Sequence, residues 1–288
     1  MQTALKLRNL LFAPGDSARK AEKALASQAD GIILDLEDSV GLPNKDAARA
    51  TVAGLLPTLS RPGVFVRINP RGTPQYLPDL AGIVAARPYG IMLPKCTGPH
   101  DIAALDHHLE ALETASGQEP GRILVLALVT ETAASLRDMD YRGAPARLAA
   151  LCFGAEDLSA DLGISPRAGS AYVAPVAAAR AMTLLAAGAA GLPALDTPFP
   201  DPRDPGGLAR EAAAAAADGF AGKLCIHPDQ LGPVAAAFTP DAERRRWAEQ
   251  VRDGFAARPG EGVFLLDGKM IDRPHLKLAE RILAASAT

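Results

Sequence analysis

Short apolar runs recur along the chain, and each is followed by a turn and then by apolar residues at helical spacing. Most of these runs are apolar throughout rather than alternating with polar residues, which is typical of parallel strands buried on both faces. The pattern predicts eight strands, at residues 7–13, 31–36, 64–68, 90–93, 123–129, 148–153, 193–196 and 223–226.

Helices are predicted in the gaps between these strands. Ser17 and Asp101 are residue types that favour helix N-caps. Eight strands that alternate with helices indicate an α/β fold, and they favour a (β/α)8 TIM-like barrel over an open sheet. An open doubly wound sheet is the alternative, but the glycine-rich turn expected after its first strand is missing. The predicted helices span residues 17–27, 44–56, 101–115, 132–139, 176–187 and 207–217.

The pattern changes after Pro228. A charged helix is predicted at 241–256, a short strand at 263–266, and a last helix at about 274–284. We therefore predict a barrel catalytic domain at residues 1–235. A C-terminal helical extension at 236–288 would act as a cap or a subunit contact.

Composition excludes several classes of partner. A net charge of −3 gives no reason to expect nucleic acid. No run approaches the ~20 apolar residues of a membrane span. The three cysteines show no C-x-x-C pairing, so neither disulfides nor zinc are indicated. These features predict a cytoplasmic protein with small-molecule substrates.

Charged side chains follow six of the eight predicted strands. In a barrel of this type the carboxyl ends of the strands meet at one mouth, where active sites lie. Scattered surface charge would not favour one end of the barrel, so we expect the site there. The residues are Asp35, Glu37, Asp38, Arg67, Lys95, Glu131, Glu156, Asp157 and Asp196.

Glu131 and Asp157 follow neighbouring predicted strands, and no histidine or cysteine ligand accompanies them. Two carboxylates form a hard oxygen site that suits Mg²⁺, with Mn²⁺ as an alternative. The competing interpretation is that both are salt-bridged or helix-capping carboxylates, since each also precedes a helix, where negative charge is favourable.

Arg67 and Lys95 are the cations of the same predicted mouth. Arginine can bind a carboxylate with two parallel hydrogen bonds or stabilise a developing oxyanion, and it can equally pair with Glu37 or Asp38. Lys95 is a Schiff-base candidate only if burial lowers its pKa. Because so many carboxylates surround it, we expect a raised pKa and a charge-balancing role.

Nine motifs in one order resemble the citrate lyase β-subunit-like family, which includes malyl-CoA and citramalyl-CoA lyases. The resemblance covers nearly the whole chain. The motifs are R-N-L-L-F-A-P-G-D at 8–16, I-L-D-L-E-D-S-V at 33–40, V-R-I-N-P at 66–70, L-P-K at 93–95, T-E-T-A at 130–133, F-G-A-E-D-L at 153–158, D-T-P at 196–198, G-K-L-C-I-H-P at 222–228 and D-G-K-M-I-D at 267–272.

The resemblance implies a Mg²⁺-dependent carbon–carbon lyase with a coenzyme A thioester substrate and a 2-oxo acid product, or the reverse condensation. It implies metal ligation by Glu131 and Asp157 and an acid/base role for Asp272. Glu37 and Asp38 would lie around metal-bound waters. Family members are commonly trimers or hexamers, so a homotrimer or hexamer is expected. The resemblance further assigns substrate contacts to Arg67, Lys95, Gly154, Ala155 and Glu156.

Three alternatives remain open at this point. The chain departs from the family pattern at residues 165–175 and 199–200, the region in which the thioester tail would run. The first alternative is a metal-dependent aldolase on free hydroxy-oxo acids without coenzyme A. In the second, a thioesterase step follows condensation. The third is a lyase subunit that depends on an acyl-carrier partner.

Overall fold

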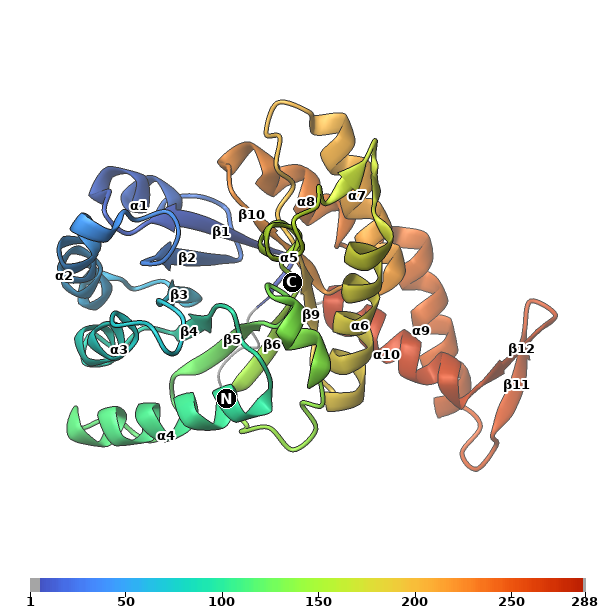
Figure 1. The fold of residues 1–288 in the computed structure, drawn as a ribbon. Coiled ribbons are helices and arrows are strands. Elements are labelled where there is room, and N and C mark those ends of the chain that lie inside the picture. Colours follow the sequence, from blue (N-terminus) through green and yellow to red (C-terminus); the bar gives the residue numbers. More distant parts are fainter. Residues whose placement is uncertain (1–5, 287–288) are drawn as a thin grey trace. The chain divides into compact units, whose positions relative to one another are not determined.

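Eight parallel strands close into a barrel in the computed structural model, which describes residues 6–286 (Figure 1). Strand β1 pairs with both β2 and β10, so the sheet has no open edge. The predicted barrel is therefore confirmed, and the open-sheet alternative is wrong. In order around the barrel the strands are β1 (Asn9–Pro14), β2 (Gly31–Asp35), β3 (Val64–Arg67), β4 (Gly90–Leu93), β5 (Leu124–Leu128), β6 (Leu148–Cys152), β9 (Ala194–Asp196) and β10 (Gly222–Cys225).

The strands are apolar throughout because both of their faces are buried. One set of side chains forms a core cluster to which every strand of the barrel contributes, and each large member stabilises the fold by about 1.5–3 kcal/mol. The neighbouring residues of the strands, such as Ile32 and Leu34, are also fully buried, on the opposite face. The interior cluster contains Leu10, Ile33, Phe65, Met92, Leu126, Leu128, Ala150, Cys152, Leu195 and Leu224.

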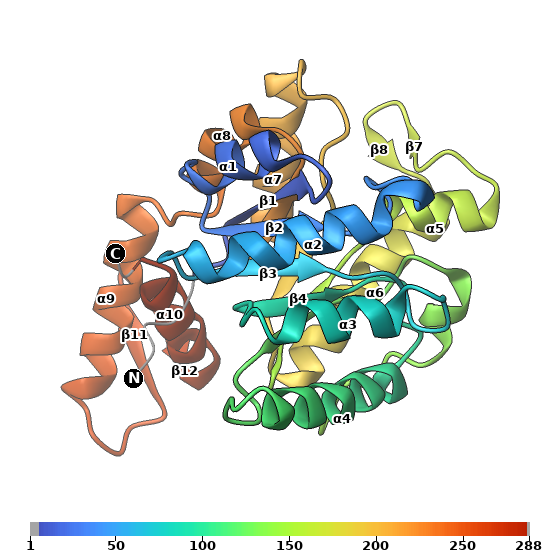
Figure 2. The same ribbon diagram turned by 90° about the vertical axis from the view of Figure 1, so that its left-hand side faces the viewer.

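Helices cover the outside of the barrel, and Figure 2 shows α2, α3 and α4 lying side by side along it. Ser17 accepts a hydrogen bond from the backbone of Lys20 and caps α1, as its residue type predicts. The helices of this unit are α1 (Ala18–Leu25), α2 (Lys45–Leu55), α3 (Tyr76–Val84), α4 (Pro99–Ala115), α5 (Ala155–Leu162), α6 (Ala174–Ala190), α7 (Pro205–Asp218) and α8 (Leu231–Ala237).

Several connections differ from the predictions. The helix predicted at residues 132–139 is only a 3-10 segment, Ala133–Arg137, which the side chain of Thr132 caps. Helices α3, α5 and α8 were not predicted, since seven to nine residues give a weak periodic signal. A small hairpin, β7 (Arg167–Ala168) with β8 (Ala171–Tyr172), joins α5 to α6. The remaining 3-10 segments are Leu42–Asn44, Leu56–Thr58 and Pro228–Gln230.

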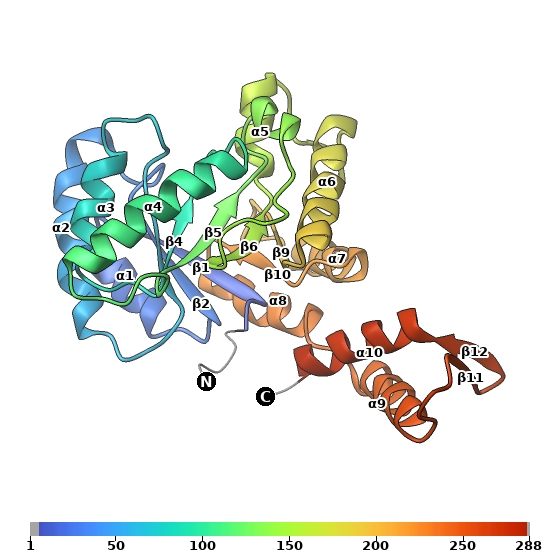
Figure 3. The same ribbon diagram turned by 90° about the horizontal axis from the view of Figure 1, so that it is seen from below.

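The chain divides into two compact units between Ala235 and Ala236. In the second unit α9 (Ala242–Ala256) and α10 (Arg273–Ser286) pack side by side, and the antiparallel hairpin of β11 (Val263–Leu266) and β12 (Lys269–Asp272) extends from their ends (Figure 3). Its own small core includes Val251, Phe255, Ile271 and Ile282. Within residues 6–286, no helix has the length and apolar character needed to cross a membrane.

Candidate active site

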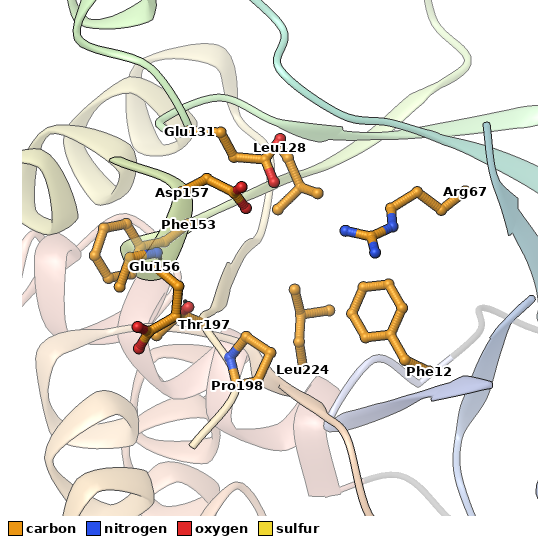
Figure 4. A pocket seen from close by; sticks show the side chains of 12 residues that line it. Phe12, Arg67, Leu128, Glu131, Phe153, Glu156, Asp157, Thr197, Pro198 and Leu224 are labelled. Carbon is orange, nitrogen blue, oxygen red and sulfur yellow. Dashed lines mark hydrogen bonds between the residues drawn. The ribbon is translucent and has the colours of Figure 1, made fainter. Parts of the chain in front are cut away.

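A cavity of about 100 Å³ opens at the carboxyl ends of the barrel strands (Figure 4). Its lining comes from six strands or the residues that follow them, which places it at the mouth predicted from the sequence. Residues far apart in the chain therefore share one small space. The lining residues are Phe12, Arg67, Leu128, Glu131, Phe153, Gly154, Ala155, Glu156, Asp157, Thr197, Pro198 and Leu224.

Glu131 and Asp157 come together in this cavity. Glu131 follows β5 and Asp157 lies in the first turn of α5, after β6, and these two strands are paired neighbours. Figure 4 shows the two carboxylates near one another and both pointing into the cavity, with the Arg67 guanidinium on its other side. Glu131 is only 2% exposed, whereas the side chain of Asp157 is about one-third exposed.

The charge around Glu131 is unfavourable without a further cation. Burial raises the pKa of Glu131 well above its usual range, and repulsion from Asp157 and Glu37 adds to the effect. Arg67 and the backbone N–H of Lys95 oppose this shift but do not cancel it. A bound cation would relieve the repulsion and keep both carboxylates ionised.

The donor set fits Mg²⁺. Two facing carboxylates leave the other coordination positions to water and substrate oxygens, which is the arrangement Mg²⁺ prefers. Across residues 6–286 no group of three histidine, cysteine, aspartate or glutamate side chains forms a ready metal cage. The site therefore suits a metal that is only partly held by protein, and it does not suit a structural zinc.

Arg67 is held rigidly beside the carboxylate pair. Its Nε and Nη2 donate to the two oxygens of Asp35 at 2.7 Å, and the guanidinium lies over the Phe12 ring at 4.8 Å. Its Nη1 is 3.1 Å from Glu37 Oε2 in an ion pair, although that oxygen has no hydrogen-bond partner of acceptable geometry among the described residues. The Asp35 partner was not predicted, although Asp35 and Arg67 stand side by side in the β2–β3 register.

Asp35 itself is firmly ionised. Burial alone would raise its pKa, but the hydrogen bonds and the charge of Arg67, with hydrogen bonds from Ser39 and from the backbone N–H of Glu37, bring it below the usual range. The pair fixes the guanidinium so that little freedom is lost when it meets an anion.

Lys95 links the carboxylates at the rim. Its backbone adopts a left-handed conformation, with φ of 49°, and its N–H donates to Glu131 Oε2 at 2.5 Å. Its ammonium contacts Glu37 and lies 3.4 Å from Asp38 and 3.8 Å from Asp157. Burial would lower the pKa of Lys95, but these carboxylates outweigh it and raise the pKa above its usual value. Lys95 therefore stays charged, which disfavours a Schiff base.

The start of α5 is braced from neighbouring strands. Gly154 N–H donates to Thr130 Oγ1 at 3.0 Å, and Ala155 N–H donates to Thr197 Oγ1 at 3.2 Å. Glu156 pairs with Arg167 at 3.0 Å. The N–H groups of Gly154 and Ala155 therefore already donate hydrogen bonds within the protein. These two residues can contact a substrate only by lining the cavity, and not by donating their N–H groups.

Asp196 does not belong to the charged mouth, and that expectation is wrong. Side chains alternate along a strand, and Leu195 faces the barrel interior, so Asp196 on β9 faces outward. There it is fully buried and pairs with Lys223 at 2.7 Å and Arg180 at 3.0 Å. Asp196 and its partners anchor the strand that presents Thr197 to α5.

Asp272 lies in the second unit, at the end of β12. Its Oδ1 is 2.5 Å from Nδ1 of His275, in the first turn of α10. His275 was not singled out from the sequence, although its spacing of three residues from an aspartate at a helix start is a recognisable signal.

Replacing Gly154 by alanine is expected to weaken Mg²⁺ binding about 10–100-fold with little loss of stability. A Cβ at Gly154 would lie 2.6 Å from Cγ of Glu131, so the side chain would have to move away from Asp157. Titration calorimetry with Mg²⁺ would measure the change. Gly188→Ala is the matched control, because a Cβ there meets nothing within 4 Å. Equal Mg²⁺ affinity in the two variants would contradict a role for the Glu131 position.

Residues 8–228, which include every strand of the barrel, match a family described as HpcH/HpaI aldolase/citrate lyase. The chain belongs to this family. The family and the enzyme class predicted from the sequence are confirmed.

Two curated relatives of this family member align over nearly its whole length. It is 33% identical over 280 residues to the citrate lyase subunit beta of Haemophilus influenzae, covering 96% of this chain and 95% of that protein. It is 32% identical over 298 residues to the mitochondrial citramalyl-CoA lyase of Rattus norvegicus, covering 98% and 86%.

The barrel of this aldolase/citrate lyase family member also resembles solved structures. The protein CitE from Mycobacterium tuberculosis, in complex with magnesium, acetoacetate and coenzyme A, superposes with a TM-score of 0.78. The two sequences are 33% identical, and the match covers 98% of each chain. The similarity therefore includes both units.

Proposed function

We propose that this protein is a Mg²⁺-dependent carbon–carbon lyase. Its substrate would be a 3-hydroxyacyl-CoA of the malyl, citramalyl or citryl type, which it would cleave to an acyl-CoA and a 2-oxo acid, or form in reverse. The observation that carries the proposal is the facing pair of Glu131 and Asp157 beside Arg67 at the barrel mouth. The relatives named as lyases, and the related structure holding magnesium, acetoacetate and coenzyme A, support it.

The residues of the mouth fit distinct roles in this chemistry. Bound Mg²⁺, held by Glu131 and Asp157, would polarise the oxo or hydroxy oxygen of the substrate. Arg67, fixed by Asp35, would stabilise negative charge that develops on the thioester fragment. Glu37, Asp38 and Lys95 would balance charge and order water at the rim. Gly154, Ala155 and Glu156 would bound the substrate space.

Asp272 would transfer the proton to and from the acyl fragment. Asp272→Asn is expected to lower kcat by at least ~10²-fold, because the amide cannot take up or return that proton. Mg²⁺ affinity should be unchanged, since Glu131 and Asp157 stay in place. Steady-state assays and Mg²⁺ titration of the variant measure both quantities, and near wild-type turnover would remove Asp272 from the proposal.

The proposal is tested by assaying the purified chain with malyl-, citramalyl- and citryl-CoA, with Mg²⁺ and after chelation. Cleavage of one thioester that needs Mg²⁺ is the expected result. Cleavage of free hydroxy-oxo acids alone would favour the aldolase alternative. Activity only after addition of an acyl-carrier protein would favour a lyase subunit. The same assay run in reverse shows whether free coenzyme A is released by a thioesterase step.

We also propose a homotrimer or hexamer, which light scattering of the purified protein would test. The cytoplasmic location stays a prediction.

A further inference from the structure

A second cavity lies at the amino ends of β3, β4 and β5, the opposite end of these strands from the Glu131 site. Its volume is about 380 Å³, compared with about 100 Å³ for the site at the mouth. Figure 2 shows β3 and β4 side by side behind α2 and α3. The chain that leaves α2 enters β3 at this end, and the chain that leaves α3 enters β4. Three arginines and no carboxylate line the cavity. The lining consists of Leu56, Leu59, Ser60, Arg61, Pro62, Val64, Arg87, Tyr89 and Arg122.

Two other arginines at this end of the barrel have carboxylate partners. Arg8, before β1, donates two hydrogen bonds to Asp30. Arg147, before β6, pairs with Asp106 and Glu113. Through these contacts the two arginines stabilise the fold.

Arg61, on the cavity wall, is also engaged. Its Nη1 donates to the carbonyl oxygen of Leu25 at 2.8 Å, and its Nη2 donates to that of Ala29 at 2.6 Å, at the end of α1 and in the loop after it. Carbonyl groups do not neutralise it, and burial lowers its pKa because its charge is poorly solvated. Asp30 offsets part of this effect, but its carboxylate is already held by Arg8.

Arg87 and Arg122 differ from the other arginines. Within residues 6–286 neither side chain has a hydrogen-bond or ion-pair partner, and both are exposed at the cavity. Arg87 is held in a left-handed backbone conformation, with φ of 58°, directly before Pro88. The Tyr89 hydroxyl likewise has no partner in the described part of the chain, while its ring packs edge-on against Phe65 at 5.5 Å.

The cavity therefore combines uncompensated positive charge with an apolar wall. Two free guanidinium groups and a phenol can donate to the oxygens of one tetrahedral anion. Leu56, Leu59 and Val64 supply a surface for an apolar or planar body attached to it. A phosphate group fits the charged part of the cavity, because its oxygens accept paired hydrogen bonds from guanidinium groups.

We propose that this cavity is an anion site that binds a phosphate group through Arg87, Arg122 and the hydroxyl of Tyr89. The ligand is either free phosphate or a phosphate monoester whose remaining part lies on the Leu56, Leu59 and Val64 wall. The inference does not depend on the proposed lyase function, because it uses none of the residues at the barrel mouth.

The test is titration calorimetry of the full-length protein, without added metal, against inorganic phosphate, adenosine monophosphate and adenosine. We expect saturable binding of a phosphate-bearing probe. Arg87→Ala combined with Arg122→Ala should weaken it by about a hundredfold, roughly tenfold for each guanidinium removed. Tighter binding of adenosine monophosphate than of phosphate would support an ester as the ligand, and equal or weaker binding would support free phosphate.

Arg210→Ala is the matched control, because Arg210 is an exposed arginine of α7 outside the cavity that has no ion pair within residues 6–286. It should bind the phosphate-bearing probe as the wild type does. Because Arg87, Arg122 and Arg210 are all exposed, none of these substitutions should unfold the chain. Thermal unfolding of the variants verifies this. The proposal is overturned by absence of saturable binding, by binding that survives the double substitution, or by adenosine binding as tightly as the tighter of the two phosphate-bearing probes.

Discussion

Replacement of Glu131 by glutamine is expected to lower Mg²⁺-dependent kcat/KM by roughly 10³-fold or more. A catalytic metal contributes several kcal/mol to transition-state stabilisation, and each 1.4 kcal/mol corresponds to about a factor of ten in rate. Glutamine keeps the size of Glu131 and can still accept the N–H of Lys95, so the fold should be retained. The neutral amide, however, leaves Asp157 as the single carboxylate facing the metal. Steady-state assays and Mg²⁺ titrations measure the loss.

The same substitution should change how stability depends on pH. In the metal-free protein the pKa of Glu131 is raised, so the folded state retains a proton that the unfolded chain loses near the usual glutamate pKa. The free energy of unfolding therefore falls as pH rises from that value through the raised pKa. Glu131→Gln should remove this decline, and Mg²⁺ should restore stability to the wild type only at the higher pH values.

Urea unfolding at several pH values, with and without Mg²⁺, measures this effect. Glu110→Gln is the matched control, because Glu110 is an exposed glutamate of α4 that lies outside the cavity. Its effects on turnover and on the pH profile should be small. Wild-type Mg²⁺ affinity in Glu131→Gln would show that the carboxylate pair is not the metal site.

The barrel and the meeting of Glu131 with Asp157 were accessible from the sequence for one physical reason. Strands buried on both faces give continuous apolar runs, and consecutive parallel strands in a barrel place their carboxyl ends at the same rim. Strands β5 and β6 are such neighbours, so two residues that are 26 positions apart in the chain share one cavity. Only the strand count and the strand direction were needed.

Other features depend on contacts that a linear pattern does not carry. Strand β9 is three residues long, too short to show alternation, so the outward orientation of Asp196 was hidden. The choice of Asp35 rather than Glu37 or Asp38 as the two-pronged partner of Arg67 follows from the β2–β3 register. The left-handed backbone of Lys95, which directs its N–H to Glu131, has no signature in a non-glycine residue.

Arg67→Met is the second change with a large expected effect, and it should act on both stability and turnover. Removing the guanidinium leaves the buried carboxylate of Asp35 without its cation, which costs about 3–5 kcal/mol. Turnover should fall by roughly 10²–10³-fold, as for loss of one oxyanion donor. Because Arg67 lowers the pKa of Asp35, the pair stabilises the fold above the usual aspartate pKa, and the stability gap should close as pH falls.

Combining Arg67→Met with Asp35→Asn separates the two effects. Asparagine removes the buried charge, so the double variant should recover most of the lost stability in urea unfolding while kcat/KM stays low. Recovery of stability without activity assigns the guanidinium to the chemistry rather than to the scaffold. Recovery of both would mean that Arg67 serves only to neutralise Asp35, and the oxyanion role proposed for it would be refuted.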